Sequence, residues 1–239
     1  MERSLGVFGF NHLTFQEYLT AKYLSSKDKG LQIITENLKD PWWREVILLY
    51  AGLKDATPLI KAILKEEDDI FYNNLFLACG CLADAVKVDP NLRKELLKKL
   101  YNLYWNGKFE LWRENALSTL VDIATPEVLT HFIEKLKDED SRVRVRSAYA
   151  LGNLGKDTTE IIKALRDALK DEDLNVRMSS VYALGNLGKD IPVVINTLID
   201  ALKDEDQDFS KSYIFMTIPI KCNKLVVQVN LWKNQWKVM

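Results

Sequence analysis

The sequence contains few of the residues on which tight turns, disulfide frameworks and membrane spans depend. Its 239 residues include 10 glycines, 6 prolines and 3 cysteines. So few glycines and prolines exclude an all-β sandwich rich in turns, and an odd set of three cysteines excludes a disulfide framework. No apolar stretch approaches the roughly 20 residues of a membrane helix, and Met1–Ser4 lacks the charged-then-apolar plan of a signal peptide. We therefore expect a soluble, cytoplasmic protein.

The charge of the chain is nearly balanced. The formal net charge is −1, with 28% charged and 47% hydrophobic residues. This composition is typical of a folded globular protein and argues against disorder. No overall positive charge favours binding to nucleic acid or to an anionic membrane.

Most of the prolines mark helix starts. Asp40-Pro41, Thr57-Pro58, Asp89-Pro90 and Thr125-Pro126 each place an N-cap residue before a proline. The cap side chain can accept a bond from a free N–H, and proline lacks the N–H that would have no partner there. The chain is therefore predicted to be mostly helical.

A long internal repeat occupies the second half of the chain. The segment from Leu136 to Asp157 recurs from Leu169 to Asp190, an offset of 33 residues, and a third copy opens at Leu202–Asp206. Weaker copies lie upstream, at Trp112–Ile123 and at Leu77–Leu82. Repeats of this length are typical of stacked supersecondary units.

Each repeat is predicted to be a helical hairpin. In the second copy the expected buried positions recur at helical spacing: Ile161, Ile162, Leu165 and Leu169 in the first helix, and Val176, Val181, Leu184 and Leu187 in the second. Asp173 is placed to cap the second helix, Ala183 and Gly185 allow close helix approach, and Gly188 is expected at a left-handed C-cap. A lone hairpin cannot bury its apolar face, so the copies must stack.

The pattern Asp-x-x-Val-Arg-x5-Ala-Leu-Gly-x-Leu-Gly, from Asp140 to Gly155 and from Asp173 to Gly188, resembles the HEAT repeat family. It is most similar to the short bacterial type found in phycobilisome lyases. The resemblance implies an all-α fold, an α-solenoid of HEAT-like helical hairpins. It also implies a structural ladder along the stack, formed by Asp140, Arg144, Asp173 and Arg177.

The N-terminal segment has a structural interpretation and a resemblance. Thr14 and Glu17 have the spacing of a capping box, with Leu13 and Tyr18 as its hydrophobic staple. A stripe of Phe15, Leu19 and Tyr23 follows.

The same segment, together with Pro41–Leu53 and Asn74–Ala83, resembles in order the region that follows the ATPase core of NACHT-type signalling NTPases. This chain contains no Gly-x-x-x-x-Gly-Lys-[Ser/Thr], so it cannot hold a nucleotide in the P-loop manner. The resemblance therefore implies the sensor-side part of such a protein, without its ATPase core.

Four motifs resemble chemical sites but favour structural interpretations. Gly152–Asp157 and Gly185–Asp190 end helices, whereas a phosphate loop precedes one. His131 and Glu134 share a helix face, but no second His-Glu pair completes a di-iron site, and HEAT-type deoxyhypusine hydroxylases would require several. Cys79 and Cys81 point to nearly opposite sides of a helix, so they are poorly placed to bind one metal ion, and we expect them to be buried small side chains.

No nucleophile–base pair can be identified, because neither His12 nor His131 has an evident partner. The sequence thus predicts no enzymatic activity, no cofactor and no metal site.

The second-helix positions that the repeat pattern leaves free form the predicted partner surface. They are Arg146 and Ser179, Tyr149 and Tyr182, and Asn153 and Asn186, with Arg142 beside them. Stacking places equivalent residues in parallel rows, along which HEAT solenoids generally bind proteins or peptides. Arg142, Arg144 and Arg146 also form a basic patch that could meet phosphate or an acidic protein, although a solvated face is the simpler interpretation.

The expected organisation is a NACHT-like junction at residues 1–30, degenerate helical repeats at 31–124, HEAT repeats at 125–206 and an atypical tail at 207–239. The tail is rich in β-branched and aromatic residues, which favours strand, and is either an unusual cap or a truncated or frame-shifted end. The predicted function is a protein-interaction scaffold in a NACHT-like protein, with no membrane partner or small-molecule substrate. The alternatives are a phycobilin lyase or isomerase subunit and, less favoured, a nucleic-acid-binding protein.

Overall fold

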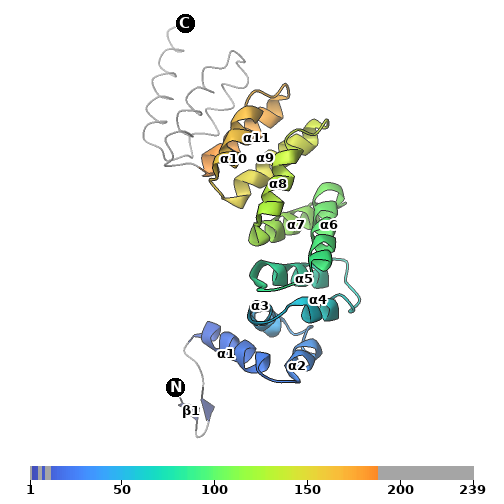
Figure 1. The fold of residues 1–239 in the computed structure, drawn as a ribbon, viewed down its shortest axis with the longest axis vertical. Helices are drawn as coiled ribbons and strands as arrows, with labels where there is room; N and C mark the ends of the chain where they lie inside the picture. Colours follow the sequence, from blue (N-terminus) through green and yellow to red (C-terminus); the bar gives the residue numbers. More distant parts are fainter. Residues whose placement is uncertain (1, 5–6, 9–11, 188–239) are drawn as a thin grey trace. The chain divides into compact units, whose positions relative to one another are not determined.

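The computed structural model describes residues 2–4, 7–8 and 12–187 of the chain. The chain divides into two compact units, Met1–Ile123 (unit 1) and Ala124–Met239 (unit 2). The described residues are almost entirely helical (Figure 1), as expected for an α-solenoid of helical hairpins. The tail at 207–239, the third repeat copy at Leu202–Asp206 and Gly188 lie outside the described residues.

Unit 1 opens with a short antiparallel pair of strands, β1 (Glu2–Ser4) and β2 (Val7–Phe8), in which Glu2 is opposite Phe8. Its helices are α1 (Leu13–Ser25), α2 (Gly30–Glu36), the 3₁₀ turn η1 (Pro41–Trp43), α3 (Arg44–Leu53), α4 (Thr57–Ile63), α5 (Asn73–Asp84), α6 (Pro90–Asn106) and α7 (Glu110–Ile123).

The odd-numbered helices of unit 1 form one stacked row. Helix α1 packs on α3, α3 on α5 and α5 on α7, while α2, α4 and α6 pack beside this row (Figure 1). The core between the helices is aliphatic, and its largest fully buried side chains include Ile34, Ile47, Leu59, Leu96 and Leu100. Each hairpin therefore buries its apolar face against its neighbours, which is how a helical-repeat array is stabilised.

The helix starts predicted from proline are confirmed at three of four positions. Asp40 caps η1 and Asp89 caps α6, each accepting backbone N–H bonds, and Thr125 occupies the N-cap of α8. Thr57 is instead the first residue of α4, because Asp55 accepts its N–H at 2.9 Å. The Thr57 hydroxyl accepts the N–H of Asp89 at 2.8 Å, which ties the start of α4 to the start of α6.

The capping box predicted for the N-terminal helix is wrong. Helix α1 begins at Leu13, with His12 at the N-cap and no side-chain cap bond. Thr14 therefore lies inside the first turn, and Glu17 is buried within unit 1. Phe15, Leu19 and Tyr23 do form a stripe, but all three side chains are exposed.

Unit 2 contains two described hairpins, formed by α8 (Pro126–Lys135) with α9 (Ser141–Leu154) and by α10 (Thr159–Ala168) with α11 (Leu174–Leu187). The predicted buried positions of α10 and α11 lie in the core, with Leu169 and Leu187 half-buried.

Equivalent residues in the two hairpins of unit 2 make equivalent bonds. Asp140 accepts the N–H of Arg142 at 2.9 Å, and Asp173 accepts that of Asn175 at 2.8 Å, so each aspartate caps its helix as predicted. Gly155 ends α9 in the left-handed region, with φ 64°. This conformation suits glycine because it has no Cβ.

None of the described helices is both long and apolar enough to cross a membrane.

Candidate functional site

Helices α9 and α11 are the second helices of neighbouring repeats, and they pack directly against each other. An open groove of about 590 Å³ runs between their outer faces. Its lining residues are Ser141, Arg142, Val145, Arg146, Tyr149, Asp173, Asn175, Met178, Ser179 and Tyr182. Five residues of the predicted partner surface thus line one groove: Arg142, Arg146, Tyr149, Ser179 and Tyr182.

Two tyrosines dominate the groove. The rings of Tyr149 and Tyr182 stack with centroids 6.0 Å apart and planes inclined by 16°. The residues are 45% and 41% exposed. They face each other because they hold the same position in successive repeats, and such stacked pairs are favourable. The groove therefore contains a stacked aromatic pair that is partly open to solvent.

The two predicted asparagines lie beyond the groove. Asn153 and Asn186 are both exposed, one turn after Tyr149 and Tyr182 respectively. The Asn153 side-chain amide donates to the carbonyl of Tyr149 at 2.8 Å. That bond is a local one within α9.

The charged residues of the groove are Arg142 and Arg146, in the first two turns of α9, and Asp173, directly before α11. The Arg142 guanidinium pairs with Asp140 at 2.8 Å while its side chain stays 86% exposed. The hydrogen bond from the Arg142 side chain, helped by the Arg142 N–H, lowers the pKa of Asp140. Across the groove, the hydroxyl of Ser141 and the N–H of Asn175 lower the pKa of Asp173. Both aspartates are therefore held ionised beside Arg142.

The predicted ladder residue Arg144 is not part of an exposed basic patch. Its Nε and Nη2 each donate at 2.8 Å to the two carboxylate oxygens of Asp171, in the following repeat. Nη1 donates to the carbonyls of Asp138 and Glu139. Only about a tenth of each side chain in the Arg144–Asp171 pair is exposed. Of the three arginines of the predicted basic patch, Arg142 and Arg146 line the groove and Arg144 does not.

The ladder pairing from the sequence therefore needs correction. Arg144 bonds neither Asp140 nor Asp173 but Asp171, two residues before the expected acid. The other two aspartates are occupied as N-caps, which leaves the turn acid free to accept the fork of Arg144. Arg177 repeats the bonds that Arg144 makes to the backbone of its own turn, since its Nη1 donates to the carbonyls of Asp171 and Glu172.

Opposing effects act on the carboxyl of Asp171. Burial raises its pKa, whereas the Arg144 hydrogen bonds, the N–H of Asp173 and the Arg144 charge lower it. The lowering effects prevail, so the pKa lies below its usual range. The Arg144 pKa is raised, chiefly by its hydrogen bonds to Asp171.

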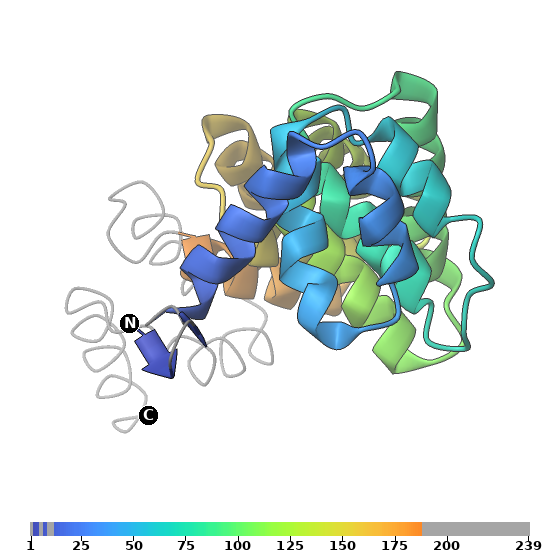
Figure 2. The same ribbon diagram turned by 90° about the horizontal axis from the view of Figure 1, so that it is seen from below.

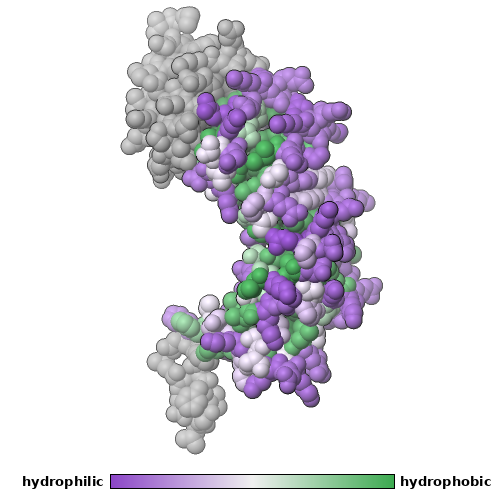
Figure 3. Space-filling model, viewed as in Figure 1, coloured by the Kyte–Doolittle hydropathy of each residue, from purple (hydrophilic) through white to green (hydrophobic). Residues whose placement is uncertain are grey.

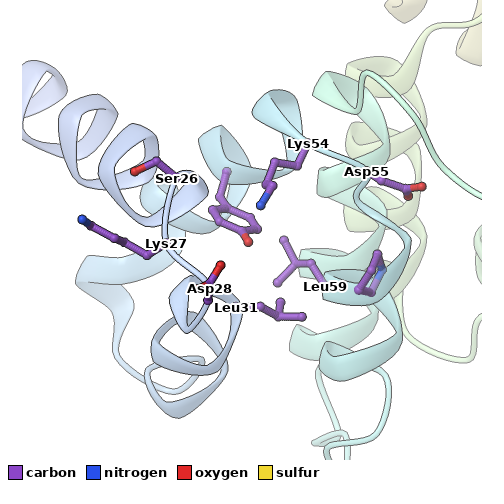
Figure 4. Close-up of a pocket in the computed structure, with 9 residues that line it drawn as sticks. Ser26, Lys27, Asp28, Leu31, Lys54, Asp55 and Leu59 are labelled. Atoms are coloured by element: carbon purple, nitrogen blue, oxygen red, sulfur yellow. The ribbon is translucent and has the colours of Figure 1, made fainter.

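A second hollow lies in unit 1, between the α1–α2 turn and helices α3 and α4. It measures about 420 Å³. Figure 4 shows the Lys54 side chain reaching into it, while Asp55 turns away. Asp55 pairs with Lys87 at 3.5 Å. Burial raises the pKa of Tyr50, which also lines the hollow. The lining residues include neither histidine nor cysteine.

The two histidines occupy structural positions. His12 is the N-cap residue of α1, and its ring contacts Phe15 edge-on at 6.1 Å. His131 is half-buried on α8 against Phe132, and burial together with the charge of Lys135 lowers its pKa. Glu134 is exposed. Within the part of the chain that the structure describes, no three His, Cys, Asp or Glu side chains gather as metal ligands would.

Cys79 and Cys81 are fully buried free thiols, as predicted. Burial raises the pKa of Cys79, with the neighbouring Cys81 adding to it, and burial raises the pKa of Cys81 to about 12. The nucleophilic thiolate is therefore scarce at neutral pH.

We expect neither thiol to react with a disulfide reagent such as DTNB at pH 8 in the folded chain, and both to react in urea. The measurement uses a Cys222→Ser background, so that only these two thiols are counted. Rapid reaction without denaturant would show that α5 opens readily.

Comparisons with known proteins bear on the repeats. Residues 129–213 match the family model for HEAT repeats, so the chain contains HEAT repeats over that range. No curated protein matches the sequence.

Among solved structures, human deoxyhypusine hydroxylase in complex with glycerol is similar at 15% identity and a TM-score of 0.39, covering 87% of this chain and 78% of that chain. An engineered protein is similar at 17% identity and a TM-score of 0.33, covering 92% and 69%.

The prediction that the chain has no enzymatic activity is corrected by this comparison. Deoxyhypusine hydroxylase is an enzyme with a HEAT-like fold, so a helical-repeat fold does not exclude catalysis. At 15% identity and a TM-score of 0.39 the match does not show that this chain is an enzyme.

Proposed function

We propose that unit 2 binds a protein segment in the groove between α9 and α11. The observation that carries this proposal is the stacked, exposed pair Tyr149–Tyr182 inside a groove that a partner could enter. Tyrosine supplies a large, rigid contact area, and aromatic residues are enriched at protein interfaces. HEAT repeats commonly present such rows of equivalent side chains to their partners.

The lining of the groove suggests the chemistry of the segment. Tyr149, Tyr182, Val145 and Met178 offer apolar surface, and Met adapts its shape to different side chains. Arg146 adds a positive charge, whereas Arg142 is paired with Asp140 and the carboxylate of Asp173 also lines the groove. The segment is therefore proposed to carry an aromatic or aliphatic anchor close to an acidic residue.

Replacing Tyr149 and Tyr182 together by alanine is expected to weaken this binding at least 10-fold, because truncating anchor aromatics costs most of an interface's energy. Peptides are first selected from a random 12-residue display library on the intact chain. The Kd values of these peptides for the parent chain and for the double-alanine variant are then measured by fluorescence anisotropy.

The Lys163→Ala variant, which alters an exposed side chain of α10 outside the groove, serves as the matched control and should bind normally. A Tyr149→Phe/Tyr182→Phe chain keeps the stacked rings and should retain most of the affinity. Equal binding by the alanine and parent chains would contradict the proposal, as would selected peptides without acidic residues.

The proposed setting is the sensor side of a NACHT-like signalling NTPase. Support comes from the three N-terminal sequence phrases, which fall on α1, on η1 with α3, and on α5. These helices stack consecutively, as successive repeats of one array would.

The setting is tested by asking whether a P-loop ATPase is encoded beside, or fused to, this coding sequence in its genome. It is tested further by asking whether that ATPase binds residues 8–85 in the full chain. Absence of such an ATPase would remove the proposed setting and leave the groove proposal untouched.

A further inference from the structure

Helix α1 turns an unusual face to solvent. Its buried residues are Glu17, Ala21 and Leu24. Phe15, Leu19 and Tyr23 lie on the opposite side and are 61%, 44% and 61% exposed. A surface helix normally buries its apolar stripe and exposes its charges. In α1 the arrangement is inverted, since the only acidic residue is buried and the largest apolar residues are outside.

The exposed stripe lies on the free side of α1 within unit 1. The inner side of α1 packs on α3, and Figure 2 shows α1 at the front of unit 1, beside α2. Hydrophobic surface is visible around α1 among hydrophilic residues in Figure 3. Terminal elements of a repeat array usually present a polar outer face, because nothing stacks on them. An apolar outer face indicates instead a surface that another element covers.

The spacing of the stripe fits a helix as its partner. Phe15, Leu19 and Tyr23 follow one another at intervals of four residues, which makes a ridge along one side of the helix. Ridges of this kind pack into the grooves of a second helix. The ridge from Phe15 to Tyr23 covers eight residue steps and is about 12 Å long. Two to three turns of a partner helix therefore suffice to cover the ridge.

The charge beside the stripe restricts the partner further. Lys22 is the one exposed charged residue of α1, and Lys27 follows in the next turn of chain. Their ammonium groups lie 5.8 Å and 4.6 Å from the ring centroids of Tyr18 and Tyr23, at the edges of the stripe. Beside Lys22, the exposed residues Lys27, Asp28 and Lys29 that follow α1 include only one acid, Asp28, so a second copy would bring mainly like charges together. A partner with acidic flanks would pair with them.

We infer that the outer face of α1 docks an amphipathic helix whose apolar stripe is bordered by glutamate or aspartate. Phe15, Leu19 and Tyr23 supply the apolar contact, and the positive charges of Lys22 and Lys27 favour a partner with negative charge beside its apolar stripe. This surface belongs to unit 1 and is separate from the groove between α9 and α11, so either site can exist without the other.

The test is a display library of 18-residue helical peptides with leucine fixed at one stripe and Glu, Lys, Gln or Ala at the flanking positions. Peptides that bind the full chain are selected, and those that also bind a Phe15→Ser/Leu19→Ser/Tyr23→Ser variant are removed. We expect enriched peptides to have acidic flanks, to bind the variant at least 10-fold more weakly, and to lose affinity as salt rises. A Lys22→Glu/Lys27→Glu chain should instead favour peptides with lysine flanks.

Because the three replaced side chains are exposed, circular dichroism should show that the serine variant keeps its helical fold, with at most a small fall in melting temperature. Three results would overturn the inference: no enrichment over the serine variant, enriched peptides with neutral or basic flanks, or a parent chain that dimerises through this face in light scattering. Binding of the parent chain to phosphatidylcholine–phosphatidylserine vesicles that the serine variant loses would also overturn it, since a membrane would then be the occupant.

Discussion

Replacing Arg144 by alanine is expected to lower the free energy of unfolding of unit 2 by about 3 kcal/mol, because removing one partner of a buried ion pair leaves the other charge without compensation. Arg144 makes two bonds to Asp171 and two to backbone carbonyls of its own turn. In the variant the Asp171 carboxylate keeps the N–H of Asp173 as its partner, at 2.9 Å. The loss therefore concerns the contact between successive repeats.

Hydrogen exchange with mass spectrometry can follow this loss in each unit separately. A change of about 3 kcal/mol corresponds to roughly 100-fold faster exchange in α9 and α11, where a tenfold change equals about 1.4 kcal/mol. Helices of unit 1 serve as the internal reference. The matched control is Arg142→Ala, two residues away, because that arginine is also ion-paired but almost fully exposed. Exposed pairs contribute little, so the control should exchange like the parent chain.

The contribution of the pair should also depend on pH. The pKa of Asp171 is lowered in the folded chain, so its stabilising effect is complete above its unfolded pKa of about 3.9 and is lost as the pH falls through the folded value. The Asp171→Asn variant lacks this titration. Its stability difference from the parent chain should therefore be constant above about pH 5 and shrink below pH 4. A difference that stayed constant down to pH 2 would show that Arg144 acts through its carbonyl bonds alone.

Local patterns in the sequence predicted the parts of this fold that local interactions determine. The aspartate caps at Asp140 and Asp173 and the left-handed Gly155 depend on neighbours within a few residues, and the described residues show the aspartate cap in both repeats. The tyrosine pair follows from the same logic, because identical positions in stacked repeats must face each other. Repetition thus converted a local pattern into a prediction about contacts between repeats.

Contacts chosen among several candidate residues were harder to predict. The turn Lys170–Asp173 offers three acids, and the structure shows that Asp171 accepts both hydrogen bonds of Arg144 while the exposed Glu172 lies 3.6 Å from the same guanidinium. Likewise, the stripe of α1 was visible in the sequence, but periodicity does not show which side of a helix faces the core. The position of Glu17 inside unit 1 determines this, and nothing in the spacing of Thr14 and Glu17 distinguishes it from a capping box.

A methyl group added at Gly152 is expected to destabilise unit 2 by about 1–3 kcal/mol, because it would overfill the contact between α9 and α11. A Cβ there would lie 2.7 Å from Cα and 2.9 Å from Cβ of Ala183. The first of these atoms belongs to the backbone of α11, so the helices themselves must separate. Alanine gains up to about 1 kcal/mol in helix propensity over glycine, which reduces the net loss, and Gly152→Val should lose more than Gly152→Ala.

Gly80→Ala is the matched control, since it places the same methyl group in helix α5. A Cβ at Gly80 would meet only Cδ2 of Leu48, at 3.1 Å, and that half-buried side chain can rotate away. Without a backbone clash, the higher helix propensity of alanine dominates. The free energy of unfolding should then be unchanged or higher by up to about 1 kcal/mol. Urea unfolding followed by circular dichroism compares the two variants. Equal effects would mean that α9 and α11 do not depend on close approach at Gly152, and the groove above them should then keep its width and its peptide affinity in Gly152→Ala.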